Sequence, residues 1–138
     1  MQYATLKEKI SAEKAIRAQR YTEFAQLYQD ACEAGRAAAA RVTPAPMIVR
    51  EDIPGGRSWT VADGPCGFAW ITVTPGNCSF ALWLKKQGIA RRNYGEPGVI
   101  IWVSEYDQSM IRKSAYANAF AEVIRAAGIK AYAGSRLD

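Results

Sequence analysis

The chain has 138 residues, of which 49% are hydrophobic and 22% charged, and its formal net charge is +5. This length and composition are those of one globular domain that buries a core without disulfides or metal. The sequence contains no histidine, which excludes a Ser-His or Cys-His nucleophile pair and an imidazole metal site within one chain. We therefore expect a protein that is not an enzyme and that holds neither metal nor cofactor.

The cysteines and the apolar runs indicate in which cell compartment the protein is found. Cys32, Cys66 and Cys78 share no CxxC spacing, so neither a zinc site nor a disulfide framework is predicted. No apolar run approaches the roughly 18 residues of a membrane span, and the N-terminus lacks the apolar segment of a signal peptide. These observations predict a cytoplasmic protein with reduced thiols and no membrane partner.

The first predicted element is a long helix over residues 5–40. Thr5 and Glu8 fit a capping box that satisfies free amides of the first turn. Apolar residues recur with helical spacing in the second half of this segment, whereas cations interrupt the stripe in the first half. We expect residues 1–43 to form an N-terminal helical arm, suited to a homodimer contact, and residues 47–138 to form a single α+β domain.

Three strands follow the arm. Residues 47–50 are predicted to form a short edge strand, and the Pro-Gly-Gly segment after them a loop. Residues 58–62 and 67–74 are predicted to form a hairpin across a turn at residues 63–66.

One face of the predicted strand 67–74 is aromatic. Phe68 and Trp70 alternate there with small aliphatic residues whose face suits packing against helices. For the aromatic face two interpretations are open: it is exposed for binding, or the N-terminal helix covers it. Of the four tryptophans, we expect Trp70 and Trp83 alone to be partly exposed.

A short helix is predicted next, capped by Asn77 or Ser79 and ending before Gly88, which suits the left-handed cap position. The run 99–103 is apolar throughout, a pattern typical of a central strand covered on both faces.

The last third of the chain contains a helix and a strand. The helix covers residues 109–127 and begins at Ser109, and the strand covers residues 129–133. Together with strand 99–103 they predict a right-handed βαβ unit. The order α-β-β-α-β-α-β predicts an α+β fold with a mixed sheet.

Positive charge gathers in the second half, where residues 65–138 carry nine Lys and Arg against five Asp and Glu, a balance of +4. Four of the cations bracket the C-terminus of the short helix, and Tyr94 lies next to them: Lys85, Lys86, Arg91 and Arg92. Two interpretations of this cluster are open. In the first, the four cations form an anion-binding platform, and the aromatic residue stacks on a base. In the second, the lysines complement the helix dipole and the arginines are solvated loop residues.

Three further cations are candidates. Arg112 and Lys113 lie in the first turn of the last helix, where cations are unfavourable, so a phosphate or the acidic neighbours Glu105 and Asp107 hold them there. An enzymatic alternative would use the same two carboxylates. Arg136 follows the last predicted strand and binds an anion or pairs with an acidic residue.

The chain resembles a family of small tailed-bacteriophage proteins in four stretches: CGFAWITVTPG, FALWLKKQGIARRNYG, VIIWVSEYDQSM and AGIKAYAGSRLD. The resemblance covers about residues 59–138. It implies an infected bacterial cell as the setting, where small phage proteins bind a host or defence component or sequester a nucleotide signal.

These observations predict a phage accessory protein for host takeover or anti-defence that is not an enzyme. We expect it to bind nucleic acid or a nucleotide signal through eight residues: Lys85, Lys86, Arg91, Arg92, Tyr94, Arg112, Lys113 and Arg136. The alternative is an inhibitor or adaptor that docks on a host protein through the N-terminal helix and exposed aromatic residues. In both cases the protein acts in the cytoplasm of the infected cell.

Overall fold

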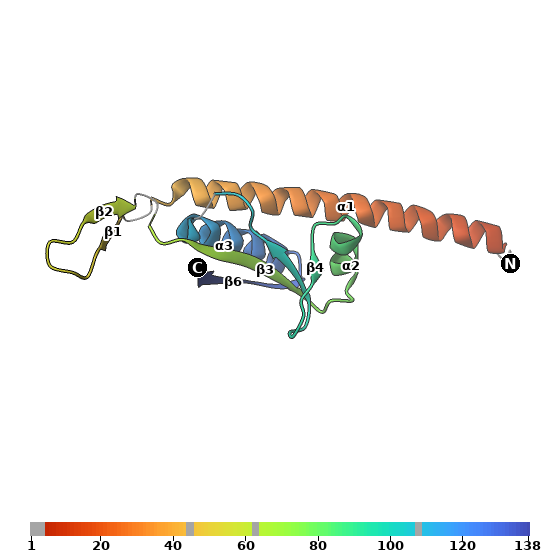
Figure 1. Ribbon diagram of the computed structural model, residues 1–138. Coiled ribbons are helices and arrows are strands. Elements are labelled where there is room, and N and C mark those ends of the chain that lie inside the picture. Colours follow the sequence, from red (N-terminus) through yellow and green to blue (C-terminus); the bar gives the residue numbers. More distant parts are fainter. Residues whose placement is uncertain (1–4, 44–45, 62–63, 107–108) are drawn as a thin grey trace.

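The structure, a computed structural model, describes residues 5–43, 46–61, 64–106 and 109–138. Its elements follow the chain in this order (Figure 1): α1 (Leu6–Arg41), β1 (Met47–Arg50), β2 (Ser58–Val61), β3 (Gly67–Thr74), α2 (Ser79–Lys86), β4 (Arg91–Arg92), β5 (Val99–Trp102), α3 (Met110–Ala126) and β6 (Lys130–Leu137). The predicted α+β class is confirmed.

The helix α1 is one continuous element of 36 residues. The amide of Glu8 donates to Thr5 Oγ1 at 3.2 Å, and the amide of Thr5 donates to Glu8 Oε2 at 2.9 Å, which confirms the capping box. Residues 5–20, which we call the overhang, are exposed and project past the rest of the molecule (Figure 1). From Tyr21 onward the helix packs on the body. The part of the helical arm that projects from the body therefore ends near residue 20.

The second half of α1 packs closely against α3 through small residues. Ala31, Gly35 and Ala39 are buried there, and a Cβ atom at Gly35 would lie 2.8 Å from Cδ2 of the Tyr116 ring. Glycine is therefore the residue that lets the two helix backbones approach each other at this point.

Replacing Gly35 with alanine overpacks the Tyr116 ring, which costs about 1–3 kcal/mol, while alanine gains about 1 kcal/mol in helix propensity. The free energy of unfolding is therefore expected to fall by a net ~0–2 kcal/mol. Urea unfolding followed by circular dichroism measures the change. Ser11→Ala on the exposed overhang is the control and should stay within about 0.5 kcal/mol of the wild type. A more stable Gly35→Ala variant would contradict the close contact.

Aromatic residues connect α1 to α2 and α3. The ring of Tyr28 lies 6.3 Å from that of Trp83 and 5.9 Å from that of Phe120. Burial first, and then a hydrogen bond with Cys32, raise the pKa of Tyr28 to about 12. The same two causes raise the pKa of Tyr116. Both phenols therefore stay protonated to a higher pH than an exposed tyrosine, because the apolar interface disfavours the charged phenolate.

Three helix ends test the predicted caps. Ser109 begins α3 by accepting a hydrogen bond at Oγ from the Arg112 amide at 3.4 Å, and Gly88 has a φ of 75°, so both of these predictions are confirmed. The N-cap of α2 is Cys78, whose Sγ accepts from the Ala81 amide at 3.5 Å. The expectation of Asn77 or Ser79 was therefore wrong by one residue.

The main sheet has four strands in the order β4-β5-β3-β6. Every strand pairing in the described part of the chain is antiparallel, so the expectation of a mixed sheet was wrong. β5 and β6 do run in the same direction, joined by α3, but β3 lies between them. The predicted βαβ unit is therefore split, because the antiparallel strand β3 lies between its two parallel strands β5 and β6.

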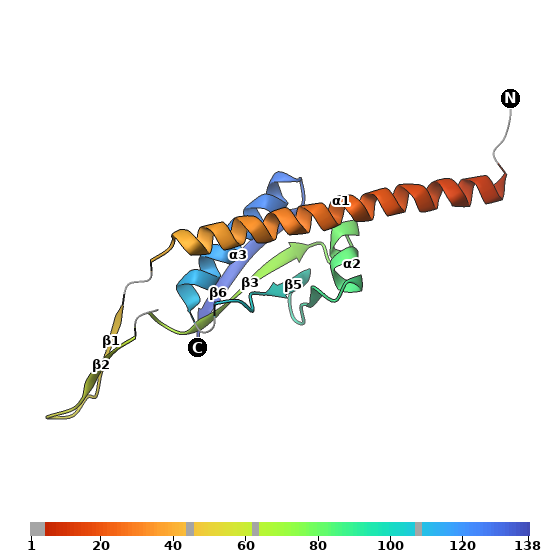
Figure 2. The same cartoon turned by 90° about the horizontal axis from the view of Figure 1, so that it is seen from above.

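β1 and β2 form a separate hairpin that projects from the body (Figure 2). An ion pair of 2.9 Å between Glu51 and Arg57 closes its loop. The predicted hairpin of 58–62 with 67–74 is wrong, because β5 and β6 occupy both edges of β3. Of the turn predicted between them, residues 62 and 63 lie outside the described part.

Candidate functional site

The two faces of the main sheet differ. Ala69, Ile71 and Val73 of β3 are fully buried in the core, and α1 and α3 lie on that side (Figures 1 and 2). The alternate residues of the strand point the other way. No described helix covers this second side, which we call the open face. Phe68 and Trp70 are half-buried on this side, and the N-terminal helix does not cover them, so the second interpretation of the aromatic face was wrong.

Aromatic side chains occupy the centre of the open face. Trp70 of β3 is directly opposite Trp102 of β5, and their rings are 5.4 Å apart at an angle of 60°. The Phe68 ring stands edge-on to Trp102 at 6.3 Å. On the other flank, a Cβ atom at Gly134 of β6 would lie 2.6 Å from the indole nitrogen of Trp70. Glycine at this position therefore lets the indole lie across β6.

A second row crosses all four strands beside the tryptophans. In register, Arg91 of β4 is opposite Ile100, Ile100 is opposite Thr72, and Thr72 is opposite Tyr132. The Thr72 hydroxyl is fully buried and has no hydrogen-bond partner among the described residues. This polar group is therefore buried beneath the open face and is not part of its accessible surface.

Cations border the aromatic centre. The Arg136 guanidinium lies 5.3 Å from the Phe68 ring centroid, and that of Arg92 lies 5.5 Å from the ring of Tyr94. Arg136 was expected to follow the last strand, but β6 continues to Leu137, so Arg136 is a strand residue opposite Phe68. Cations placed over aromatic rings are held in a fixed position, from which they can also contact an anion.

Two adjoining depressions hollow the open face near the β4–β5 loop, and they share Asn93, Tyr94, Ile100 and Trp102. The smaller, of about 370 Å³, is also lined by Trp70, Gly95, Glu96 and Arg136. The larger, of about 660 Å³, is also lined by Lys85, Ala90, Arg91 and Arg92. Volumes of this size suit small organic groups such as a nucleobase with its sugar.

Five of the eight predicted site residues therefore gather around these depressions: Lys85, Arg91, Arg92, Tyr94 and Arg136. Lys86 lies apart from them, with Nζ 5.3 Å from the Tyr21 ring centroid on α1. Whether these residues bind a ligand stays a prediction.

The two cations at the start of α3 do not join the group. Lys113 is only 7% exposed, and its Nζ donates to the Gly67 carbonyl at 3.4 Å. Burial raises the pKa of the Tyr106 phenol, and the positive charge of Arg112 nearby opposes that rise. Glu105 pairs with Arg36 at 3.4 Å, and Asp107 is outside the described residues. Internal contacts therefore account for Lys113.

The expectation that Trp70 and Trp83 alone are partly exposed was wrong for three of the four tryptophans, because Trp59 on the β1–β2 hairpin is 50% exposed as well. Trp83 is 6% exposed and packs in the core, whereas Trp102 is 46% exposed on the open face. The apolar run 99–103 was expected to be covered on both faces; on the open face Ile100 is buried as expected, but Trp102 is not. The alternation of Trp102 with the buried Ile101 and Val103 was the available signal, and it was masked because Ile100 is apolar as well.

Within the described ranges, no three acidic or thiol side chains gather in a way that could hold a metal ion. No helix in the same ranges is long and apolar enough to cross a membrane. No protein-family model, curated protein or solved structure matches the chain. The function must therefore be argued from the chemistry of the open face.

Proposed function

We propose that the protein binds single-stranded nucleic acid on the open face, without catalysing a reaction. Bases stack on Trp102 and Trp70, and Arg91, Arg92 and Arg136 contact phosphates. The observation that carries the proposal is a sheet face without a helical cover whose paired tryptophans are bordered by arginines. Stacking on aromatic side chains of an exposed sheet, next to cations, is a recurring way in which proteins bind unpaired bases.

The shape of the face favours a single strand over a duplex or a mononucleotide. A duplex keeps its base faces stacked inside, where the tryptophans cannot reach them. The four strands extend over about 14 Å at the usual spacing between strands, and two depressions adjoin each other there. The face therefore has room for consecutive nucleotides.

Fluorescence titration with oligothymidylate tests the proposal. We expect quenching of tryptophan emission and an affinity that falls steeply with salt, because each neutralised phosphate releases counterions. A duplex of equal length should bind more weakly. A salt-independent interaction, or equal affinity for duplex, would contradict the proposal. Equal affinity for a mononucleotide would favour a nucleotide signal as the ligand instead.

A second candidate function is docking on a host protein, as an inhibitor or adaptor. It is favoured by the apolar residues Leu6, Ile10 and Ile16, which are exposed on the overhang. A homodimer through the same helix stays a prediction of this kind. Removing residues 1–20 should then abolish partner binding and leave the body folded, since the packed part of α1 begins at Tyr21. In either case the proposed setting is that of a phage accessory protein in an infected bacterial cell.

A further inference from the structure

We infer that the nucleic-acid track continues from the open face over α2 onto the overhang of α1. This inference rests on the proposed function and concerns the length of the bound strand. It assigns a role to the overhang, most of which has no described part of the chain packed against it.

The overhang is basic, and its charges are ordered. At 100° per residue its five cations fall within about 160° of the helix circumference, and Glu8 lies nearly opposite their centre. Glu13 is the one acidic residue among them. The cations are Lys7, Lys9, Lys14, Arg17 and Arg20.

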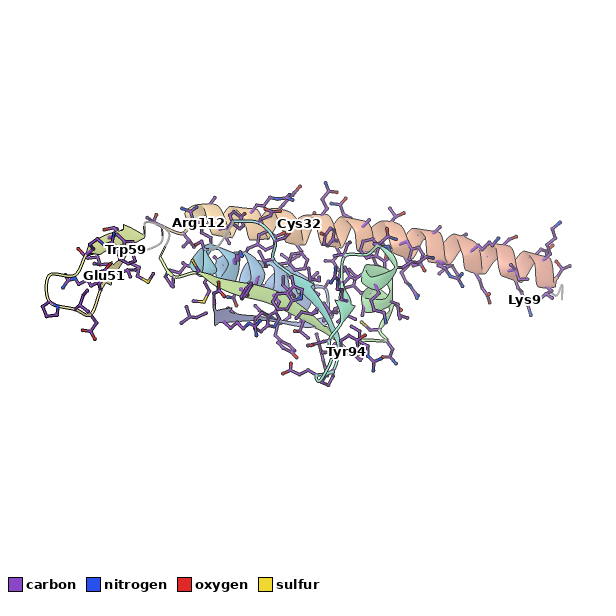
Figure 3. The ribbon with its side chains drawn as sticks, viewed as in Figure 1. Lys9, Cys32, Glu51, Trp59, Tyr94 and Arg112 are labelled. Carbon is purple, nitrogen blue, oxygen red and sulfur yellow. The ribbon has the colours of Figure 1, made fainter. Side chains whose placement is uncertain are left out.

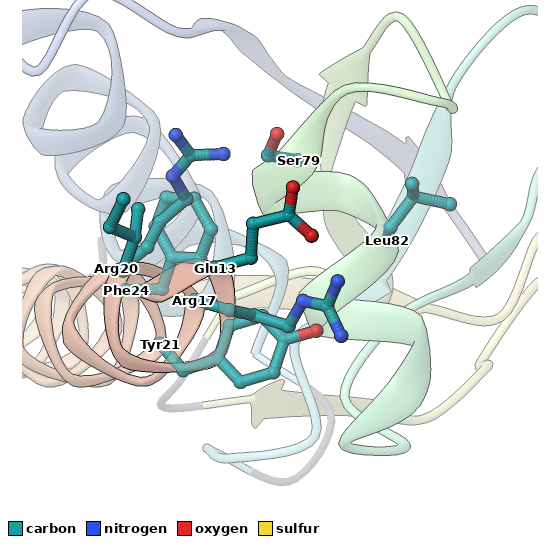
Figure 4. Close-up of a pocket in the computed structure, with 8 residues that line it drawn as sticks. Glu13, Arg17, Arg20, Tyr21, Phe24, Ser79 and Leu82 are labelled. Carbon is teal, nitrogen blue, oxygen red and sulfur yellow. The ribbon is translucent and has the colours of Figure 1, made fainter. Parts of the chain in front are cut away.

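This basic side turns toward α2. Arg17 and Arg20 line a groove of about 340 Å³ between the two helices, together with Ser79 and Leu82 of α2 (Figure 4). The groove also contains Phe24, where α1 enters the core. The cations of the overhang thus begin directly beside the body of the protein.

The cations of α2 bridge the remaining gap. Lys86 lies over the Tyr21 ring of α1, one helical turn from Arg17. Its neighbour Lys85 lines the larger depression of the open face with Arg92. Successive cations therefore lead from the sheet to the overhang. Figure 3 marks the two ends of this path with Tyr94 at the sheet and Lys9 near the end of α1.

The cations of this path are available to phosphates. The two ion pairs in the described part of the chain join Arg36 to Glu105 and Arg57 to Glu51, and neither includes a residue of the path. At 1.5 Å per residue the overhang adds about 22 Å to the reach of the open face. A strand that exceeds the open face would meet these charges next.

The experiment compares two ligands, (dT)4 and (dT)15, by fluorescence titration. Both should bind the wild type, and (dT)15 more tightly. The double variant Lys14→Gln/Arg17→Gln should bind (dT)4 as the wild type does. Its affinity for (dT)15 should fall by about 5-fold for each lost phosphate contact at 0.1 M salt. Arg41→Gln/Arg50→Gln removes the same charge elsewhere and should lower the affinity for (dT)15 much less.

Unchanged binding of (dT)15 by the overhang variant, or equal affinity of the wild type for both lengths, would overturn the inference and leave the proposed function standing. Absence of binding to either oligonucleotide would overturn the proposed function, and the inference with it. Glutamine is a good helix former, and both substituted positions are exposed. Circular dichroism should therefore show the same helix content in all variants.

Discussion

Replacing Trp102 with alanine should lower the affinity for oligothymidylate by roughly 5- to 150-fold, the equivalent of about 1–3 kcal/mol for one stacked base. The indole of Trp102 is 46% exposed and lines both depressions of the open face. Its exposed ring is therefore open to stacking by a base. Trp102→Phe keeps an aromatic face and should retain part of the affinity. Anisotropy of a labelled oligonucleotide measures both losses.

The chain offers a matched control in Trp59, which is 50% exposed but lies on the β1–β2 hairpin, away from the main sheet. Trp59→Ala removes the same side chain at nearly the same exposure. It should leave the affinity unchanged within about 2-fold, or about 0.4 kcal/mol. Equal losses in the two variants would mean that nucleic acid has no preference for the open face.

The elements specified by nearby residues were predictable from the sequence. The capping box of Thr5 and Glu8, the Ser109 cap and the left-handed Gly88 depend on contacts within one helical turn, so the local sequence determines them. The alternation along 67–74 similarly identified the aromatic side of β3. Its exposure was left open, because the side on which α1 packs is decided by contacts far along the chain.

Strand pairing could not be predicted for the same reason. Nothing local in Ser58–Val61 shows whether it pairs with β1 or with β3. The choice is made by β5 and β6, which come later in the sequence and occupy both edges of β3. The two-residue strand β4 is too short to give any periodic signal. Yet it is this strand that brings Arg91 and Arg92 to the depression that Trp102 also lines.

The candidate site was therefore half predictable. The basic cluster and Tyr94 stood out because they are neighbours in sequence. Arg136 was also predicted, although as a residue that follows the last strand, whereas Trp102 belongs to the site only through the register of β5 with β3. Lys113 was predicted as a ligand contact because its position at a helix start is unfavourable for a cation. The contact that relieves this position is with Gly67, 46 residues away.

Replacing Arg91 and Arg92 with glutamine should change the salt dependence of oligothymidylate binding more than the other substitutions proposed above. Each phosphate contact to a single strand contributes about 0.7 to the slope of log Kobs against log salt concentration, so the slope should fall by about 1.4. At 0.1 M salt this corresponds to roughly 25-fold in affinity. Both side chains are exposed and line the larger depression, so the fold should tolerate the change. Titrations at four or more salt concentrations give the slope.

The variant Arg41→Gln/Arg50→Gln separates contact from charge, because it lowers the net charge by the same two units at exposed positions on α1 and β1. Long-range attraction depends on the total charge and should change alike in both variants. Only loss of direct contact should change the slope. The variant Arg91→Lys/Arg92→Lys should keep the slope, because lysine retains the positive charge that neutralises a phosphate. It should bind more weakly, since the Arg92 guanidinium is placed over Tyr94. If both glutamine pairs lowered the slope equally, strand β4 would have no particular part in binding.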